Sequence, residues 1–291
     1  MMRQIFSVLI VTGFTFGHYV RAQQIFLDLK FNNALEISSL VFQSDKIVLL
    51  TEKCKQLYFL DNSGKVVDEQ FIDNGHIKNR EVGIEAAAWF KGGLLLADEK
   101  EGEVLYLNMT SGLVSKVDTD FDMSADIQGL EGIAVDSVRG LSYLVKEKNG
   151  NGESLVRVFK IEDGLGIPSL KFVKNVRVRL LNNDWRLADV TYNPADDQLY
   201  FLETKKRGYR VVNVKSADLE KATGENLINP ILHKDLSGFI NEFEKKGFNT
   251  NMEGLAIMDG SIYVVSDNAN TSSCSSSILG KGKTLLIKVP F

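Results

Sequence analysis

A short repeat constrains the fold of this chain more than any other feature. Each copy has a carboxylate, a run of small or apolar residues, a turn, and a second apolar run that ends in another carboxylate. The copies begin at five acidic residues spaced 49, 46, 58 and 64 residues apart: Glu36, Glu85, Glu131, Asp189 and Glu253. Repeats of this length, built from short strands, are typical of radial or linear repeat architectures. The repeat therefore predicts the fold and places an acidic residue at a similar point of every unit.

The apolar runs predict an all-β chain. Each unit offers short runs rich in Val, Ile, Leu, Tyr and Phe, separated by turn residues. Four antiparallel strands repeated about an axis form the blades of a β-propeller. We predict five blades, with six as the alternative, in a single domain over residues 23–291. The last unit lacks an outer strand and the run 24–30 has no blade of its own, so this N-terminal strand should close the ring.

The first 22 residues predict a secretory signal peptide. Arg3 supplies a positive start, a mostly apolar run covers residues 5–16, and Val-Arg-Ala at residues 20–22 suits cleavage before Gln23. A membrane anchor is the competing interpretation, but the apolar run is shorter than the roughly 20 residues that a span needs. We therefore expect a secreted or periplasmic protein without a membrane span.

Composition and cysteine usage narrow the expected partners. The chain has 34 basic and 38 acidic residues and a formal net charge of −4. This mild acidity, without a basic cluster, argues against a nucleic-acid partner, and we expect a monomer. Export permits disulfides. Cys54 and Cys274 lie in the first and last repeats, which a closed ring would bring together, so we predict a bond between them, with two unpaired thiols as the alternative.

Carboxylates should gather on one face of the ring, because antiparallel neighbours place the start of the first strand beside the end of the second. The acidic residues that open the repeats would surround the channel mouth, with a second set farther out: Glu52, Asp98, Glu147, Glu203 and Asp267. Such crowding raises carboxyl pKa values or recruits a cation, and Ca²⁺ takes six to eight oxygen ligands. We predict a Ca²⁺ site formed by Glu36, Glu85, Glu131, Asp189, Glu253 and Asp267. The alternative is that these carboxylates cap turns or face solvent.

Basic residues follow the outer carboxylate in four units, and these are Lys53, Lys100, Lys148 and Lys205. Charges of alternating sign around one mouth suit an anionic ligand bridged by a metal ion, such as a phosphate ester with Ca²⁺. We therefore predict that the four lysines bind an anionic substrate. The alternative is ordinary surface pairing between Glu and Lys in turns.

The last 60 residues carry a distinctive signature, NMEGLAIMDGSIYVVSDN over residues 251–268, followed by TLLIKV over residues 284–289. These motifs resemble the closing blade of the phytase-like propeller family, which is also described by its esterase-like activity. GLEGIAVD at residues 129–136 looks like an internal copy, and the resemblance is weaker in the first two units. It implies a functional face lined by Glu131, Glu253, Asp267 and Asn268. A looser resemblance to gluconolactonase-type propellers implies a divalent metal in the channel.

Three functions fit these features. The first is a secreted, divalent-metal-dependent hydrolase of esters or phosphoesters, in which Glu131 or Glu253 holds the metal or acts as a base, and Asn268 helps to bind substrate. The second is a non-catalytic propeller that binds a protein partner or a small ligand across its mouth. The third is a lactonase-like enzyme, which differs from the first only in substrate. A fold alone does not give a function, so the sequence leaves all three open.

Overall fold

The computed structural model describes residues 23–26, 36–123, 129–148, 150–164, 166–223, 226–267 and 284–291. The predicted signal peptide, residues 1–22, lies outside this part of the chain. Within the described part, no helix has the length and apolar character needed to cross a bilayer.

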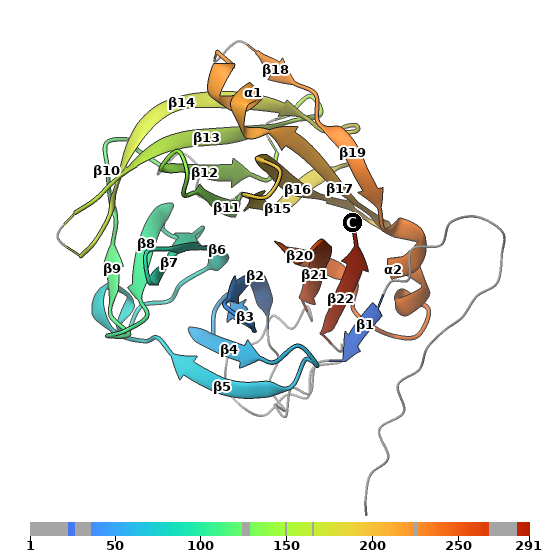
Figure 1. Cartoon of the computed structure of the whole chain (residues 1–291), viewed down its shortest axis with the longest axis horizontal. Helices are drawn as coiled ribbons and strands as arrows, with labels where there is room; N and C mark the ends of the chain where they lie inside the picture. Colours follow the sequence, from blue (N-terminus) through green and yellow to red (C-terminus); the bar gives the residue numbers. More distant parts are fainter. Residues whose placement is uncertain are drawn as a thin grey trace, which may run out of the picture.

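Five antiparallel sheets surround a central axis, as Figure 1 shows. The first blade contains β2 (Ile37–Gln43), β3 (Lys46–Thr51), β4 (Gln56–Leu60) and β5 (Val66–Phe71). The second contains β6 (Ile84–Phe90), β7 (Gly93–Asp98), β8 (Glu103–Asn108) and β9 (Val114–Lys116). The third contains β11 (Leu130–Asp136), β12 (Leu141–Lys146), β13 (Glu153–Glu162) and β14 (Ser169–Arg179). The prediction of an all-β propeller with five blades is confirmed.

The last two blades differ in how their outer strands are supplied. The fourth blade contains β15 (Arg186–Asn193), β16 (Gln198–Lys205), β17 (Gly208–Lys215) and β19 (Ile231–Asp235). The fifth contains β20 (Asn251–Met258), β21 (Ser261–Asp267), β22 (Leu285–Pro290) and, from the other end of the chain, β1 (Gln23–Phe26). Strand β1 pairs antiparallel with β22, with Gln23 opposite Lys288. The N-terminal strand therefore closes the ring, as predicted.

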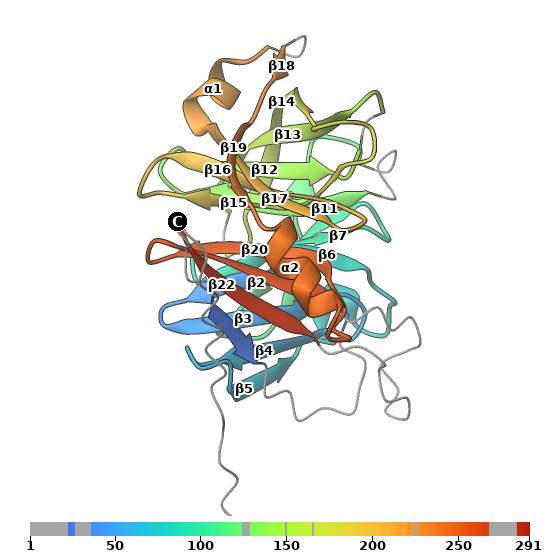
Figure 2. The ribbon, with the colours of Figure 1, turned by 90° about the vertical axis from the view of Figure 1, so that its right-hand side faces the viewer.

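Two short strands and two α-helices are added to the four-stranded blades. The strands β10 (Asp118–Thr119) and β18 (Leu227–Ile228) each pair parallel with β14. Helix α1 (Ser216–Lys221) follows β17, and α2 (Ser237–Glu244) lies between the fourth and fifth blades, where Ile240 and Phe243 are buried. Figure 2 shows α2 beside β20 and β22.

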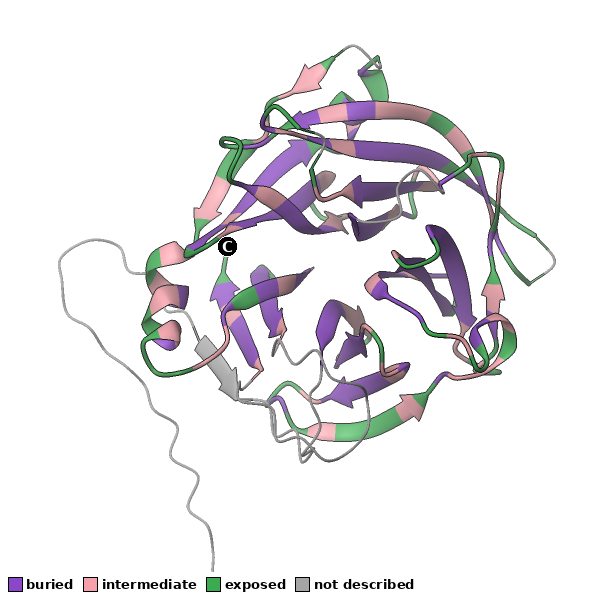
Figure 3. Cartoon of the chain, turned by 180° about the vertical axis from the view of Figure 1, so that it is seen from behind, coloured by how far each residue is buried: buried purple, intermediate pink, exposed green. Residues whose placement is uncertain are grey.

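The hydrophobic core lies in the seams between neighbouring blades. Each of five buried clusters joins side chains of two adjacent blades, and the cluster with Leu40, Tyr58 and Val265 joins the first blade to the last. Figure 3 shows that burial is concentrated in the inner strands, whereas the outer strand β5 is mostly exposed. Since buried apolar area is the main favourable term in folding, closure of the ring is needed to complete the core.

Candidate functional site

Every inner strand carries a β-bulge at the same place. The register against the second strand shifts by one residue, which leaves one residue of the inner strand without a partner. We call these the bulge residues: Ser38, Glu85, Glu131, Ala188 and Glu253. A bulge bends the strand and re-aims the side chain of the extra residue. The bulge therefore marks an equivalent position in each blade, whichever type of residue stands there.

Four of the bulge residues line one cavity of about 180 Å³ at one end of the channel. Glu85, Glu131 and Glu253 are three of them, and Ser38 is the fourth. Other residues of the same lining come from the strand ends around them: Glu36, Glu52, Arg186, Asn251 and Asp267. The structure thus brings five of the six predicted metal ligands to one place. The exception is Asp189.

The cavity also contains a cation that the sequence analysis missed. Arg186 begins β15, two residues before the bulge, and its Nη2 lies 2.7 Å from Oε1 of Glu253. Its Nη1 lies 3.3 Å from Glu147 and 3.6 Å from Glu131. Asn251, also two residues before a bulge, accepts a 3.3 Å hydrogen bond from Nη2 of Arg186 and donates to Glu253. The fourth blade therefore contributes a guanidinium to a mouth that other blades make acidic.

Aligning the repeats on their bulges would have revealed this pair. The residues two before the bulge are Glu36, Gly83, Gly129, Arg186 and Asn251. Glu36 belongs to this set rather than to the bulge residues, and it lines the cavity from there. It shares Lys53 with Glu52, and Nζ of Lys53 lies 3.0 Å from a carboxylate oxygen of each. Lys53 therefore acts as a counter-ion of the acidic cavity.

Burial raises the pKa of the three bulge glutamates. For Glu85 the pKa lies well above the ordinary 4.5, first because of burial and then because of the nearby charges of Glu52 and Glu131. Burial and Glu253 likewise raise the pKa of Glu131 well above 4.5, while Arg186 opposes the shift. The pKa of Glu253 is raised by burial against the lowering effect of Arg186. Burial disfavours the charge on Arg186, yet Glu253 and Glu131 raise its pKa, so the guanidinium stays charged.

Glu85 differs from the other two bulge glutamates in its contacts. In the described part of the chain, no hydrogen bond or ion pair reaches its carboxyl group, whereas Arg186 contacts both Glu131 and Glu253. A carboxyl group with a raised pKa and no cation beside it favours the protonated form. One cavity therefore holds a glutamate that favours the protonated form, Glu85, and two whose charged form Arg186 stabilises. Environments that separate the pKa values of neighbouring carboxyl groups are typical of an acid and a base in catalysis.

Asp189 lies one residue after the bulge and faces the neighbouring blade. Its side chain is buried, and its Oδ2 accepts a 2.7 Å hydrogen bond from the backbone N–H of Leu255 in the fifth blade. Its Oδ1 accepts a 2.7 Å bond from the N–H of Val190. Ser39, one residue after its own bulge, accepts a bond from the N–H of Ala87 in the same way. The prediction that Asp189 belongs to the ring of acids at the mouth is therefore wrong. Its carboxylate joins the fourth blade to the fifth.

Glycine fills the same position in two other blades. A Cβ added to Gly132 would lie 3.0 Å from the backbone N of Val190, and one added to Gly254 would lie 3.1 Å from the backbone N of Leu40. Backbones of adjacent inner strands thus approach closely at this point. We call this set the seam residues: Ser39, Ala86, Gly132, Asp189 and Gly254. Their side chains are small or act as hydrogen-bond acceptors because they sit between blades.

Two of the outer carboxylates also lie elsewhere than expected. Asp98 and Glu203 are fully buried within β7 and β16. Oδ1 of Asp98 accepts bonds from the N–H groups of Gly83 (3.0 Å) and Lys100 (3.1 Å), and Glu203 pairs with Arg210. Both carboxylates therefore hold local structure together. Glu52, which follows the last residue of β3, and Asp267, the last residue of β21, do line the cavity.

The donor atoms in the cavity are carboxylate oxygens, which suit a hard cation. Nevertheless, no group of three or more Asp, Glu, His or Cys residues in the described part of the chain is arranged to hold a metal ion. Arg186 already neutralises Glu131 and Glu253, and Asp189 points away. The predicted Ca²⁺ set therefore does not match the present arrangement of these side chains. Binding of Ca²⁺ stays a prediction.

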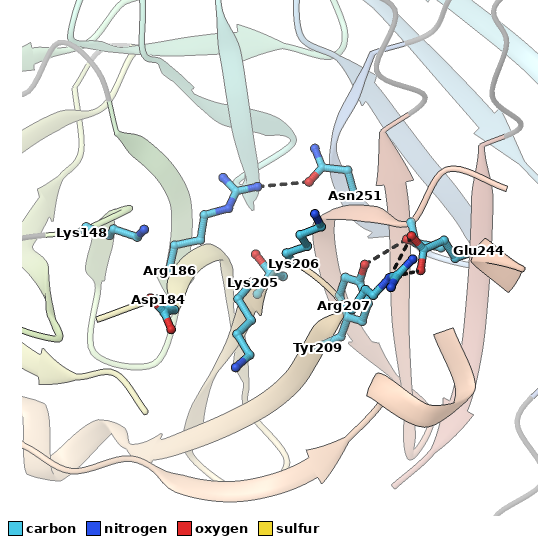
Figure 4. A pocket seen from close by; sticks show the side chains of 11 residues that line it. Lys148, Asp184, Arg186, Lys205, Lys206, Arg207, Tyr209, Glu244 and Asn251 are labelled. Atoms are coloured by element: carbon cyan, nitrogen blue, oxygen red, sulfur yellow. Dashed lines mark hydrogen bonds and ion pairs between the residues drawn. The ribbon is translucent and has the colours of Figure 1, made fainter. Parts of the chain in front are cut away.

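A second cavity, of about 380 Å³, adjoins the first and is basic. We call it the basic groove, and Figure 4 shows the residues that line it. Lys148 and Lys205, two of the four predicted substrate lysines, are among them, together with Lys206 and Arg207 at the turn between β16 and β17. Arg186 and Asn251 line both cavities. Of the other two predicted lysines, Lys53 pairs with Glu36 and Glu52 of the acidic cavity, and Lys100 pairs with Glu81.

Two predictions fall partly outside the described residues. Asn268, expected to bind substrate, and Cys274, expected to pair with Cys54, both lie in the segment 268–283. Cys54 itself lies in the turn between β3 and β4. Cys54 is disulfide-bonded, and no cysteine of the described part of the chain is free, so the alternative of two unpaired thiols is wrong. The predicted partner, Cys274, lies outside that part of the chain.

The amino-acid sequence matches the profile of a known protein family. The sequence profile described as "SdiA-regulated" matches residues 23–270, which is most of the chain. The chain belongs to the SdiA-regulated family. A comparison with curated protein sequences gave no match. The resemblance to phytase-like propellers, which rests on the motifs of the last three units, stays a prediction for this member of the SdiA-regulated family.

One solved structure with a TM-score above 0.5 supports the fold of this SdiA-regulated protein. Glutaminyl cyclase of Myxococcus xanthus is similar with a TM-score of 0.55 and 15% identity, over 94% of this chain and 96% of that one. A nidogen/laminin complex gives a TM-score of 0.47 at 10% identity, over 79% of this chain and 72% of that one. Hydrazine synthase of Kuenenia stuttgartiensis gives 0.42 at 12% identity, over 91% and 62%. At such low identity, the first of these similarities concerns the fold alone, and the other two carry no argument.

Proposed function

We propose that this protein is an exported hydrolase of ester bonds whose reaction centre is the acidic cavity at the channel mouth. The observation that carries the proposal is the set of three bulge glutamates with raised pKa in one cavity of about 180 Å³. Groups with strongly perturbed pKa values in a concave site are candidates for acid–base catalysis. Near-neutral pKa values are the most effective for proton transfer at ordinary pH.

The roles follow from the surroundings of each glutamate. Glu253, which Arg186 holds at 2.7 Å, is the base that takes a proton from the attacking water. The water oxygen then forms a bond to the ester carbonyl carbon. Glu85, which has no cation beside it in the described part of the chain, is the acid that gives its proton to the leaving oxygen as the original ester bond breaks. Glu131 shares the guanidinium of Arg186 and is the second candidate for the base.

The proposal also includes a divalent cation bound at the channel mouth. Ca²⁺ is the expected ion, and its donors would be the carboxylates around the mouth. It would supply a positive charge next to the ester oxygen, but none of the proton transfers above depends on it. A phytase-like or lactonase-like substrate range would fit the same centre.

The test is a hydrolysis screen of the protein spanning residues 23–291 against aryl carboxyl esters, phosphoesters and lactones, with and without added Ca²⁺. We expect Glu85→Gln to lower kcat/KM for the best substrate by roughly 100-fold or more, since general acid catalysis contributes about 10²–10⁴-fold. Glu162→Gln, at an exposed end of β13, is the matched control and should keep full activity.

The screen also decides between the proposal and a non-catalytic propeller. If no ester or lactone is hydrolysed above background, the hydrolase proposal fails. If hydrolysis is found but Glu85→Gln and the pair Glu131→Gln with Glu253→Gln leave it unchanged, the reaction centre is elsewhere.

A further inference from the structure

The basic groove lies beside the acidic cavity, and its charges are of the opposite sign. Its cationic side chains are Lys148, Arg186, Lys205, Lys206 and Arg207, and its acidic ones are Asp184 and Glu244. They come from the end of β12, the start of β15, the β16–β17 turn and α2. Figure 4 shows these side chains around one hollow, with Arg186 and Asn251 reaching toward each other across it. The mouth is thus divided into an acidic half and a basic half.

Not all of these cations are available to a ligand. Nε of Arg207 lies 2.9 Å from Oε2 of Glu244, so one guanidinium of the groove is already paired. Arg186 is paired with Glu253. In contrast, no acidic residue of the described part of the chain pairs with Lys148, Lys205 or Lys206, and Lys205 lies over the ring of Trp185 at 5.0 Å. Three ammonium groups therefore surround the groove without a carboxylate to neutralise them.

A buried polar group at the groove wall points the same way. Thr204 lines the groove, the residue is only 3% exposed, and its hydroxyl has no hydrogen-bond partner in the described part of the chain. A buried polar atom left without a partner is costly, and it normally finds a partner in protein, water or ligand. This hydroxyl would reach an anion in the groove only after a shift of the wall that exposes its oxygen.

We infer that the basic groove is a binding site for a phosphate-type oxyanion carried by the substrate. Ammonium groups act on phosphate as point charges, whereas planar bidentate recognition of a carboxylate needs a free guanidinium. The two guanidinium groups of this groove are already engaged, so the three lysines favour a tetrahedral anion of more than one charge. This phosphate is a handle that holds the substrate, and it is not the group that is hydrolysed.

The shared wall between the two halves sets the shape of the substrate. Arg186 and Asn251 border both cavities, so a ligand whose phosphate lies in the groove can place an ester over Glu85 and Glu253. The substrate class is then a carboxyl ester with a phosphate a short distance from the ester carbon. The role of the phosphate as a substrate handle rests on the proposed hydrolase, but binding of a free oxyanion does not.

Calorimetric titration of the protein spanning residues 23–291 with inorganic phosphate at low salt tests the binding site alone. We expect saturable binding that weakens by roughly 10-fold in Lys205→Ser/Lys206→Ser, because such a loss corresponds to removal of about 1.4 kcal/mol of interaction. Lys148→Ser, on another wall of the groove, should also weaken it. The control is Lys171→Ser/Lys215→Ser, which removes two exposed lysines that do not line the groove. No phosphate binding to the unmodified protein, or equal binding to the Lys205/Lys206 variant, would overturn the inference.

A kinetic comparison separates this inference from the hydrolase proposal. The substrates are 4-nitrophenyl acetate and 4-nitrophenyl phosphonoacetate, which carry the same leaving group with and without a fixed oxyanion. We expect the phosphonoacetate to be favoured in kcat/KM by roughly 10-fold or more, and the Lys205/Lys206 variant to lose that preference while it still hydrolyses the acetate. Phosphate binding with no hydrolysis of either ester would reject the hydrolase and keep the groove. Hydrolysis with no preference would reject the role of the phosphate in holding the substrate and keep the hydrolase.

Discussion

Asp189 and Glu253 look equivalent in the sequence, because each opens a repeat, yet the structure gives them opposite surroundings. Glu253 is a bulge residue, lines the acidic cavity and pairs with Arg186. Asp189 is a seam residue, and both of its oxygens accept backbone N–H bonds at 2.7 Å. A shift of one residue along a strand moves a side chain to the other face. The bulge, and not the acidic residue, therefore marks the equivalent position in each blade.

The blades that share a bulge then differ by chemistry. The second, third and fifth blades present a glutamate at the bulge, whereas the first presents Ser38 and the fourth presents Ala188. The fourth blade supplies Arg186 two residues earlier. The acidic half of the mouth therefore comes from several blades, and the basic half is concentrated on the fourth. Variants at the seam should affect stability, and variants at the bulge should affect chemistry.

The largest effect on stability is expected from Asp189→Ala. This change leaves the buried N–H groups of Val190 and Leu255 without their acceptor, and each such loss costs about 1–3 kcal/mol. We therefore expect the free energy of unfolding to fall by roughly 2–6 kcal/mol in denaturant titrations. Ser39→Ala, which removes one acceptor at the equivalent seam, should cost less. An unchanged unfolding midpoint for Asp189→Ala would break the distinction between seam and bulge residues.

A smaller effect is expected from Arg186→Gln, which removes the cation shared by Glu131 and Glu253. Leaving charged groups partly buried without their partner is destabilising, and because Arg186 is partly exposed we expect roughly 1–3 kcal/mol at neutral pH. The pKa of both glutamates is already raised above 4.5 in the folded state. The stability that this protonation gives is full below 4.5 and is lost as pH rises through the raised pKa values.

Loss of Arg186 raises these pKa values further, so the penalty of Arg186→Gln should shrink as the pH is lowered toward 4.5. Thermal melts of the variant and the unmodified protein at several pH values measure this directly. Arg139→Gln, which also removes an arginine from a carboxylate network but lies outside both cavities, is the comparison variant. A penalty for Arg186→Gln that does not change with pH would contradict the assigned pairing.

The fold could be predicted because the repeat, the turn residues and the short apolar runs all indicate the same architecture. Even the closing strand was predictable, since the last unit lacked an outer strand and the N-terminal run had no blade. These features depend on periodicity over tens of residues, so the fold is still predicted correctly when a repeat is misaligned by one or two positions. A site is not, because a shift of one residue along a strand moves a side chain to the other face.

The composition of the cavity could be predicted only in part for that reason. Glu85, Glu131 and Glu253 were found because a glutamate stands at the bulge itself. Asp189 was misplaced because an acidic residue stands one position later in the fourth blade. Arg186 and Asn251 were missed because their equivalents in two other blades are glycines, Gly83 and Gly129, so the repeat shows no common chemistry there. A bulge is set by backbone pairing, and the acidic repeat alone does not reveal its register.

The three bulge glutamates form one electrostatically coupled centre. Carbon-13 NMR titration of the glutamate side-chain carboxyl groups tests it most directly, with Glu85→Gln, Glu131→Gln and Glu253→Gln used to assign the signals. We expect all three glutamates to titrate above the ordinary 4.5, and the Glu85 signal to move to lower pH in Glu131→Gln because one neighbouring negative charge is removed. Titration of all three near 4.5, independently of one another, would contradict the account.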